Sequence, residues 1–136
     1  AFHAPAPADL DSRMHPFWVS DAQDFTPDSG GPLLISSGEL GAIDTYADDG
    51  QCAPCDLEMD DVDAALALVD EALAAHDRTR VGKVTLNLPV KYLGSPHTEQ
   101  LEALYEGIHD RVAAGELQWA TQGDAYDAVL SWNPDE

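Results

Sequence analysis

Cys52 and Cys55 are the residues whose types and spacing most directly suggest chemistry. Two thiols separated by Ala53 and Pro54 can close a small disulfide, hold half of a zinc site, or cycle as a redox dithiol. Zinc needs two further ligands, and the sequence contains no second CxxC or HxxxH pair. We expect a disulfide that staples a loop, which favours an extracytoplasmic setting. The redox and metal alternatives stay open.

The segment around these cysteines loosely resembles thioredoxin-like proteins, in which a CxPC motif opens a helix and the helix N-terminus activates a thiol. The resemblance has departures. Residues 48–51 read DDGQ, where that family has an apolar strand and a tryptophan. Nearby carboxylates also oppose formation of a thiolate. A redox module is therefore an alternative to the leading interpretation.

Two of the five histidines stand where expected strands meet loops. His15 precedes Pro16 and His97 follows Pro96, and loops at strand ends carry ligands in α/β folds. The simpler interpretation of each is a surface or hydrogen-bonded histidine. His109 falls beside an apolar helical stripe, so we expect it to pack. The acidic residues 56–63 could bind Ca²⁺ but lack the EF-hand order, and a solvated helix N-terminus explains them more simply.

Apolar periodicity predicts the elements that must position these residues. Helices are expected over residues 60–76, from Thr98 to a C-terminal cap at Gly115, and over residues 123–132. Strands are expected at residues 14–20, 33–35, 84–88 and 117–121, and a long surface loop at residues 37–56. Alternating strands and helices predict an α/β fold with a parallel sheet, a partial (β/α) barrel-like layer that ends in helix–strand–helix.

The same pattern predicts the domain organisation. Residues 1–13 are expected to be a linker or inter-element loop, and residues 14–136 a single α/β domain that forms the C-terminal part of a larger barrel. Four short strands cannot cover three helices with apolar stripes. Burying apolar surface contributes about 25 cal/mol per Å², so leaving these apolar helix faces exposed to water would cost many kcal/mol of stability. We therefore expect the remainder of a longer polypeptide or a tight partner chain.

The charge is extreme. The chain has 26 Asp and Glu against 6 Lys and Arg, a net charge of −20. Such a surface repels phosphates and anionic lipid heads, so nucleic acid is not an expected partner. The acids are spread along the chain, which favours halophilic adaptation over a cation-binding function. No run of 18 apolar residues exists, so we expect no membrane span.

Two segments carry a family resemblance. Residues 14–36, MHPFWVSDAQDFTPDSGGPLLIS, and the element Gln118-Trp119-Ala120-Thr121 with its flanking helices resemble the C-terminal half of polysaccharide deacetylase-like proteins. These form the NodB-homology group, carbohydrate esterase family four. The resemblance implies a secreted hydrolase of carbohydrate metabolism that acts on, or binds, an extracellular N-acetylated polysaccharide. It implies Zn²⁺ or a similar divalent metal, with ligands on early barrel strands that are not in this chain.

The resemblance also bears on catalysis. A late catalytic histidine is expected at the end of a strand like VTLNLPV, where this chain has Asn87, with His97 ten residues later. Asn87 and His97 are the candidate catalytic residues, and the departure suggests a degenerate member that binds glycan without cleaving it. A non-enzymatic acidic surface or assembly protein is a further alternative. Trp18, Trp119 and Trp132 could stack on sugars if exposed, but Trp119 is expected in the core.

Overall fold

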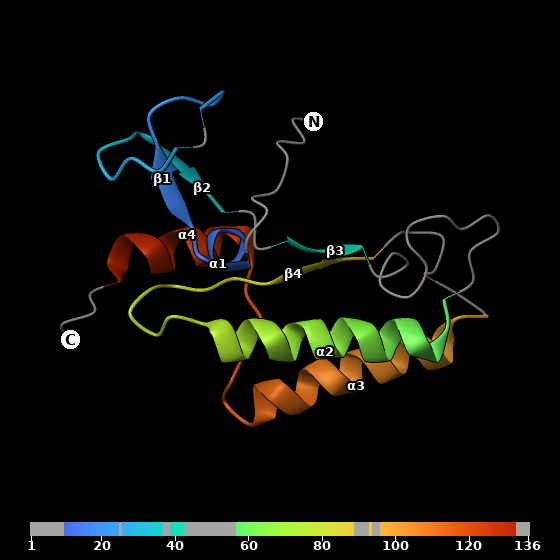
Figure 1. Ribbon diagram of the computed structural model, residues 1–136. Coiled ribbons are helices and arrows are strands. Elements are labelled where there is room, and N and C mark those ends of the chain that lie inside the picture. The colour runs from blue at the N-terminus through green and yellow to red at the C-terminus, as the bar shows by residue number, and fades with distance from the viewer. Residues whose placement is uncertain are drawn as a thin grey trace. The chain divides into compact units, whose positions relative to one another are not determined.

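The computed structural model describes residues 10–24, 26–36, 39–42, 57–88, 93 and 96–132. The chain divides into two compact units, with boundaries after Glu39, Ala74, Thr85 and Trp119. The first unit contains helix α1 (Leu10–Met14), strands β1 (Phe17–Val19) and β2 (Leu33–Ile35), the segment 75–85, and helix α4 (Gln122–Ser131). The second contains most of strands β3 and β4 and helices α2 and α3 (Figure 1).

The first unit is built on an antiparallel hairpin. Phe17 of β1 pairs with Ile35 of β2, and Val19 pairs with Leu33. The connecting loop turns on aspartates that accept hydrogen bonds from backbone N–H groups two residues later, as Asp28 does from Gly30 at 3.0 Å. A side chain at Gly31 would collide with the carbonyl of Val19, so the close return to β1 requires glycine there.

The second sheet pairs strand β3 (Glu39–Ala42) with strand β4 (Thr85–Asn87). β3 lies within the expected loop at 37–56, so that part of the prediction was wrong. The prediction of a strand at residues 117–121 was also wrong, because these residues form no strand. The prediction of a parallel sheet was wrong for β1 and β2, which pair antiparallel. The described residues form a mixed α and β structure with two separate two-stranded sheets, and they close no barrel.

Helix α2 (Met59–Ala75) confirms the helix expected over residues 60–76. Its residues Val62, Ala65, Val69 and Ala72 recur at helical spacing and are buried. At its start, the carboxylate of Asp61 accepts a hydrogen bond from the backbone N–H of Glu58 at 2.9 Å. This is half of a capping box. At least one acidic residue at this terminus therefore caps the helix, as expected of a solvated helix N-terminus.

Helix α3 (Thr98–Ala113) ends as the sequence predicts. Gly115 has a φ of 77°, and its N–H donates to the carbonyl of Val112 at 3.0 Å. The N–H of Glu116 donates to the backbone carbonyl of Arg111, also at 3.0 Å. These bonds form a Schellman motif, which needs a residue in the left-handed region. The N-terminal cap is His97 and not Thr98, and its side chain makes no capping bond.

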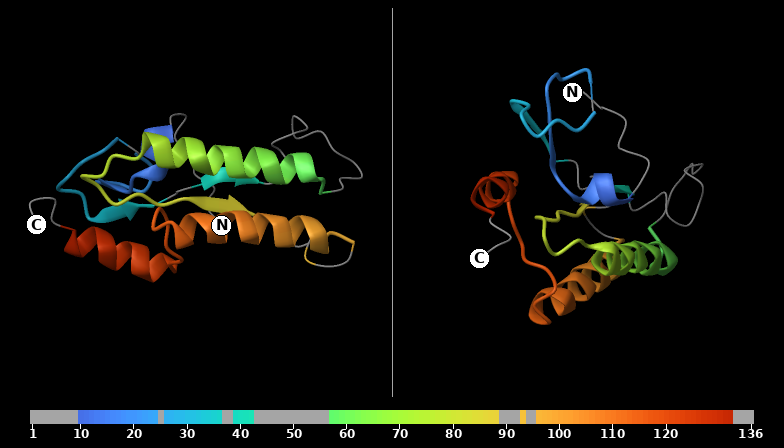
Figure 2. Two further views of the ribbon diagram at one scale, coloured as in Figure 1. Left: turned by 90° about the horizontal axis from the view of Figure 1, so that it is seen from below. Right: turned by 60° about the vertical axis from the view of Figure 1, so that its left-hand side comes forward.

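The second unit has its core between α2, α3 and β4. Leu57, Val62, Ala65 and Leu104 are buried together, and Leu86 and Leu88 pack against them. Figure 1 and the left view of Figure 2 show β4 running along the pair of helices. Gly107 of α3 permits close approach, because a Cβ there would lie 2.5 Å from Cδ1 of Leu66.

Helices α1 and α4 belong to the first unit. Leu10 begins α1, so residues 10–13 of the expected linker are helical. Helix α4 confirms the helix expected over residues 123–132 and begins with a complete capping box. The side chain of Thr121 accepts the N–H of Asp124 at 3.1 Å, and the Asp124 carboxylate accepts the N–H of Thr121 at 2.7 Å.

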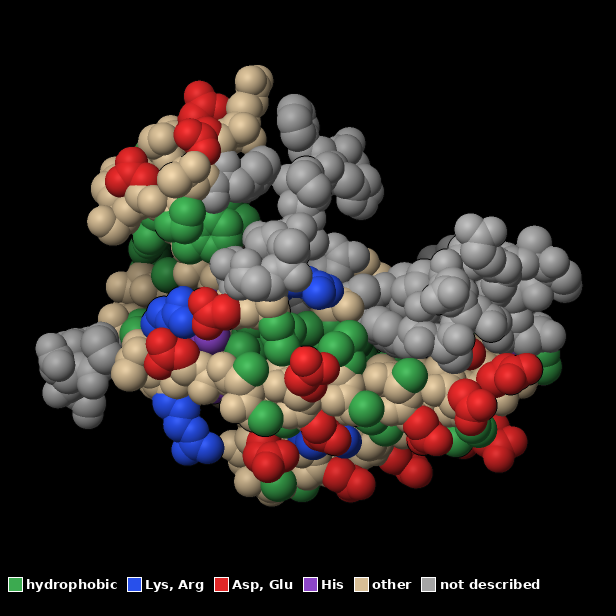
Figure 3. Space-filling model, viewed as in Figure 1, with side chains coloured by type: hydrophobic (Ala, Val, Ile, Leu, Met, Phe, Trp, Pro, Cys, Tyr) green, Lys and Arg blue, Asp and Glu red, His purple; other side chains and the backbone are tan. Residues whose placement is uncertain are grey.

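Acidic side chains of the described residues lie at several places on the face drawn in Figure 3, including the part formed by α2. Among the described residues, no helix is both long and apolar enough to cross a membrane.

Candidate functional site

An exposed aromatic pair in the second unit is the first candidate site. The side chains of Tyr105 and Trp119 are 56% and 62% exposed, and their ring centres lie 6.4 Å apart with a tilt of 41°. Glu106 and His109 line the same shallow depression. We call these four residues the Tyr105–Trp119 surface.

The end of helix α3 explains how these residues meet. Tyr105 and His109 are four residues apart on the helix and so share one face. The left-handed turn at Gly115 then reverses the chain, and Trp119 returns toward the ring of Tyr105. The prediction that Trp119 lies in the core was wrong, because the strand expected to bury it does not form. His109 was expected to pack and is instead exposed.

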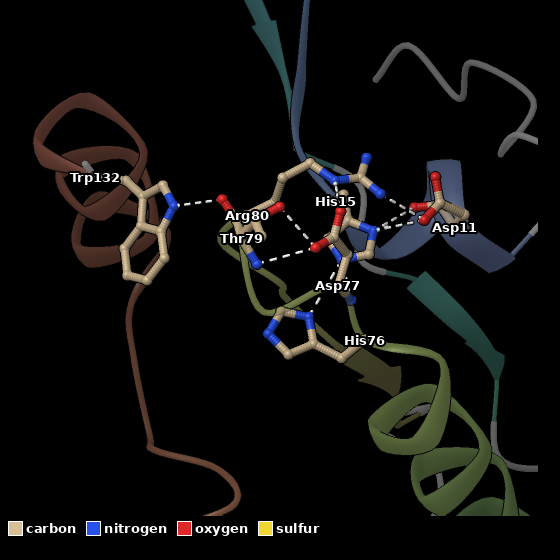
Figure 4. A network of polar contacts seen from close by, with 7 residues as sticks. All are labelled: Asp11, His15, His76, Asp77, Thr79, Arg80 and Trp132. Atoms are coloured by element: carbon tan, nitrogen blue, oxygen red, sulfur yellow. Dashed lines mark hydrogen bonds and ion pairs between the residues drawn. The ribbon is translucent and has the colours of Figure 1, made fainter. Parts of the chain in front are cut away.

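A polar network in the first unit is the second candidate site (Figure 4). His15, which follows α1, is only 2% exposed. Its Nε2 lies 3.2 Å from the backbone nitrogen of Asp77 and 3.1 Å from Nδ1 of His76. Its Nδ1 lies 3.0 Å from the carbonyl oxygen and 3.1 Å from the carboxylate of Asp11.

These contacts define which nitrogens carry protons. A backbone N–H can only donate, so Nε2 of His15 must accept from Asp77. The proton of neutral His15 is therefore on Nδ1, where it donates to Asp11. Nδ1 of His76 must in turn donate to Nε2 of His15. This leaves the lone pair of the second His76 nitrogen, Nε2, without a hydrogen-bond partner among the described residues.

The two imidazoles meet edge to edge. Their facing nitrogens are 3.1 Å apart while their ring centres are 5.3 Å apart, and the rings are inclined by only 19°. The shared hydrogen therefore lies near the plane of both rings. Gly82 makes room for this arrangement, because a Cβ there would lie 2.7 Å from Nδ1 of His76.

Charged groups surround the histidine pair. Burial lowers the pKa of His76 below its ordinary value of 6.5; the charges of His15, Arg78 and Arg80 lower it further, while Asp77 opposes them. Hydrogen bonds from Thr79 and Arg80 hold the pKa of Asp77 well below its usual range.

Residues 77–80, which follow His76, form bonds with residues of α1 and with the end of α4. Arg80 bridges Asp77 at 2.9 Å and Asp11 at 2.7 Å. Nε1 of Trp132, at the end of α4, donates to the carbonyl of Thr79 at 2.7 Å. The network thus ties residues 77–80 to α1 and α4.

The predicted site residues lie elsewhere. Asn87 is exposed at the end of β4, and His97 is buried at the start of α3. Both keep polar or electrostatic partners. Cys52 and Cys55 lie outside the described residues, so the disulfide, redox and metal alternatives stay predictions. The donor set of the described part of the chain does not fit a metal site, because no three His, Cys, Asp or Glu side chains converge there.

The sequence indicated Trp119 as a possible sugar-stacking residue and His15 as a possible ligand, but it assembled neither candidate site. The spacing of Tyr105 and His109 on a helix was visible, but the position of Trp119 depended on a strand that does not form. His15 and His76 are 61 residues apart, and no local pattern joins them. No protein-family model, curated protein or solved structure matches the chain.

Proposed function

We propose that this chain binds a neutral N-acetylated oligosaccharide on the Tyr105–Trp119 surface, as part of a polysaccharide deacetylase-like protein. The exposed, tilted pair of Tyr105 and Trp119 is the observation that carries the proposal. The resemblance of residues 14–36 and 118–121 to that family supports the choice of an N-acetylated glycan. An extracytoplasmic location belongs to the same proposal.

The chemistry of the surface suits a sugar. Aromatic faces pack against the apolar C–H faces of pyranose rings, and exposed aromatic rings gain most from being covered. Two exposed rings tilted by 41° suit the successive units of a sugar chain, whose ring planes are twisted relative to one another. Glu106 offers carboxylate oxygens to sugar hydroxyls, and His109 offers ring nitrogens that donate or accept.

The charge of the chain restricts the glycan. A net charge of −20 repels uronic acids, sulfated sugars and phosphorylated sugars. A neutral glycan escapes this repulsion, and an acetamido group supplies both an amide donor and a carbonyl acceptor. This favours N-acetylhexosamine units over acidic ones.

Calorimetric titration of the full-length protein with the tetramer of N-acetylglucosamine tests the proposal. Cellotetraose, which is neutral and lacks acetamido groups, is the matched ligand. We expect heat of binding for the first and much weaker binding for the second. The W119A variant should bind at least about fivefold more weakly, since a nucleic-acid base stacked on one aromatic side chain contributes about 1–3 kcal/mol and a sugar ring covers a similar face.

The protein control is W132F. Trp132 is half-exposed like Trp119, but it belongs to the first unit and lies outside the Tyr105–Trp119 surface. Its affinity should equal that of the unmodified protein. Absence of binding at millimolar oligosaccharide would refute the proposal, and so would equal affinities of W119A and the unmodified protein.

A further inference from the structure

We propose that His15 and His76 form an acid-opened latch in the first unit, which closes on helix α1 at neutral pH and releases it when the pair takes up protons. The proposal is independent of glycan binding. It rests on the edge-to-edge contact of two imidazoles, on the burial of His15, and on the donors that face His15.

The closed latch holds α1 through three contacts. Nδ1 of His15 donates to Asp11, within α1, and Nε2 receives hydrogen bonds from Asp77 and His76. Nearby, the backbone N–H of Lys83 donates to the carbonyl of Met14 at 2.9 Å. His15 is thus the buried side chain that joins the end of α1 to the segment after α2.

The hydrogen-bond pattern limits how many protons the closed pair can hold. A first proton can enter at Nε2 of His76, where the Nδ1–H bond to His15 survives. A second proton would have to enter at Nε2 of His15, which already faces two N–H donors. Three hydrogens cannot share that nitrogen, so the second proton requires the contact to open.

The surrounding charges also disfavour a second proton on the closed pair. Asp11 faces His15 from α1, and Asp77, Arg78 and Arg80 follow His76 in the chain. Arg80 already engages both carboxylates, at 2.7 and 2.9 Å, which weakens their attraction for a second imidazolium charge. Opening transfers both rings to water, where each accepts its proton freely.

The linkage has a definite sign. The folded pKa of His76 is lowered, so the open state binds more protons below the ordinary value of 6.5. The stability contributed by the closed pair is complete above that value and is lost as the pH falls through the folded pKa. Each additional proton bound on opening multiplies the opening constant by up to tenfold per pH unit.

Urea unfolding of the full-length protein between pH 7.5 and pH 5, at constant high salt, tests the latch. High salt screens the general effect of the net charge. The variant H15Q keeps an acceptor near the position of Nε2 but cannot be protonated. We expect its stability to fall less steeply with acid than that of the unmodified protein. H109Q removes an exposed histidine of the second unit, and its slope should match the unmodified protein.

G82A leaves every ionisable group in place. Its methyl group would press on the His76 ring, so we expect the contact to be lost at pH 7.5 and the acid dependence to weaken. If H15Q and G82A both retain the full slope, the latch does not exist. Should either variant fail to fold, ¹⁵N NMR of the unmodified protein decides. A proton on Nδ1 of His15 at pH 7.5 supports the latch, and a proton on Nε2 overturns it.

Discussion

Arg111 of helix α3 holds both carboxylate oxygens of Asp70 on helix α2, each at 2.6 Å. The pairing is bidentate, and the Arg111 side chain is only 17% exposed while the Asp70 side chain is 58% exposed. This ion pair joins the two helices at the rim of the second unit's core, beyond the point where Leu104 packs. It belongs to the class of surface pairs whose contribution is modest and depends on geometry.

We expect D70N to lower the free energy of unfolding by about 0.5 to 1 kcal/mol at neutral pH, since the Asp70 side chain remains largely in water. The hydrogen bond from Arg111 lowers the pKa of Asp70 below 3.8. Its contribution is therefore complete above that value and is lost as the pH falls through the folded pKa. Urea unfolding at pH 7 and in acid measures both effects. D63N, on an exposed carboxylate of the same helix, serves as the control and should change neither.

The capping box of α4 predicts a second effect. T121A removes the hydroxyl that accepts the N–H of Asp124, and we expect a loss of about 1 kcal/mol in the stability of that helix. T121S keeps the hydroxyl and should behave like the unmodified protein. Hydrogen exchange of the α4 amides provides the measurement. Equal protection in T121A and T121S would contradict the role given to the cap.

At Gly107 we expect side-chain packing to outweigh helix propensity in the effect of an alanine substitution on stability. Alanine at an exposed helix position gains up to about 1 kcal/mol over glycine. At Gly107, however, the new Cβ would lie 2.5 Å from Cδ1 and 2.9 Å from Cδ2 of Leu66. Overpacking costs about 1–3 kcal/mol, so we expect G107A to be destabilising overall.

A double-mutant cycle checks this origin. L66A removes the methyl groups that G107A meets, so the double variant should lose less stability than the two single losses added together. Strict additivity in urea unfolding would show that Leu66 moves aside without cost.

Asn87 offers a test of the degenerate-site hypothesis. If this chain is part of a deacetylase-like protein that lacks its late histidine, N87H should raise acetate release from N-acetylglucosamine oligomers by the full-length protein. General acid catalysis contributes about 10²- to 10⁴-fold where the group is positioned correctly. N87Q, which cannot transfer a proton, is the control. Deacetylation by the unmodified protein at rates typical of an enzyme would refute the hypothesis.

Local signals in the sequence predicted much of the secondary structure. The spacing of Val62, Ala65 and Val69 predicted helix α2, and Gly115 predicted where α3 ends, because helical periodicity and caps involve residues a few positions apart. The apolar run Leu33–Ile35 likewise predicted β2.

Tertiary structure alone decided the sheets and both candidate sites. Strand direction depends on which partner supplies the ladder of hydrogen bonds, so a strand pattern could not reveal that β1 and β2 pair antiparallel. The exposure of Trp119 depends on how the chain leaves the turn at Gly115. The contact of His15 with His76 joins residues 61 positions apart. Such a contact forms only when distant segments of the chain pack together, so the spacing of neighbouring residues cannot predict it.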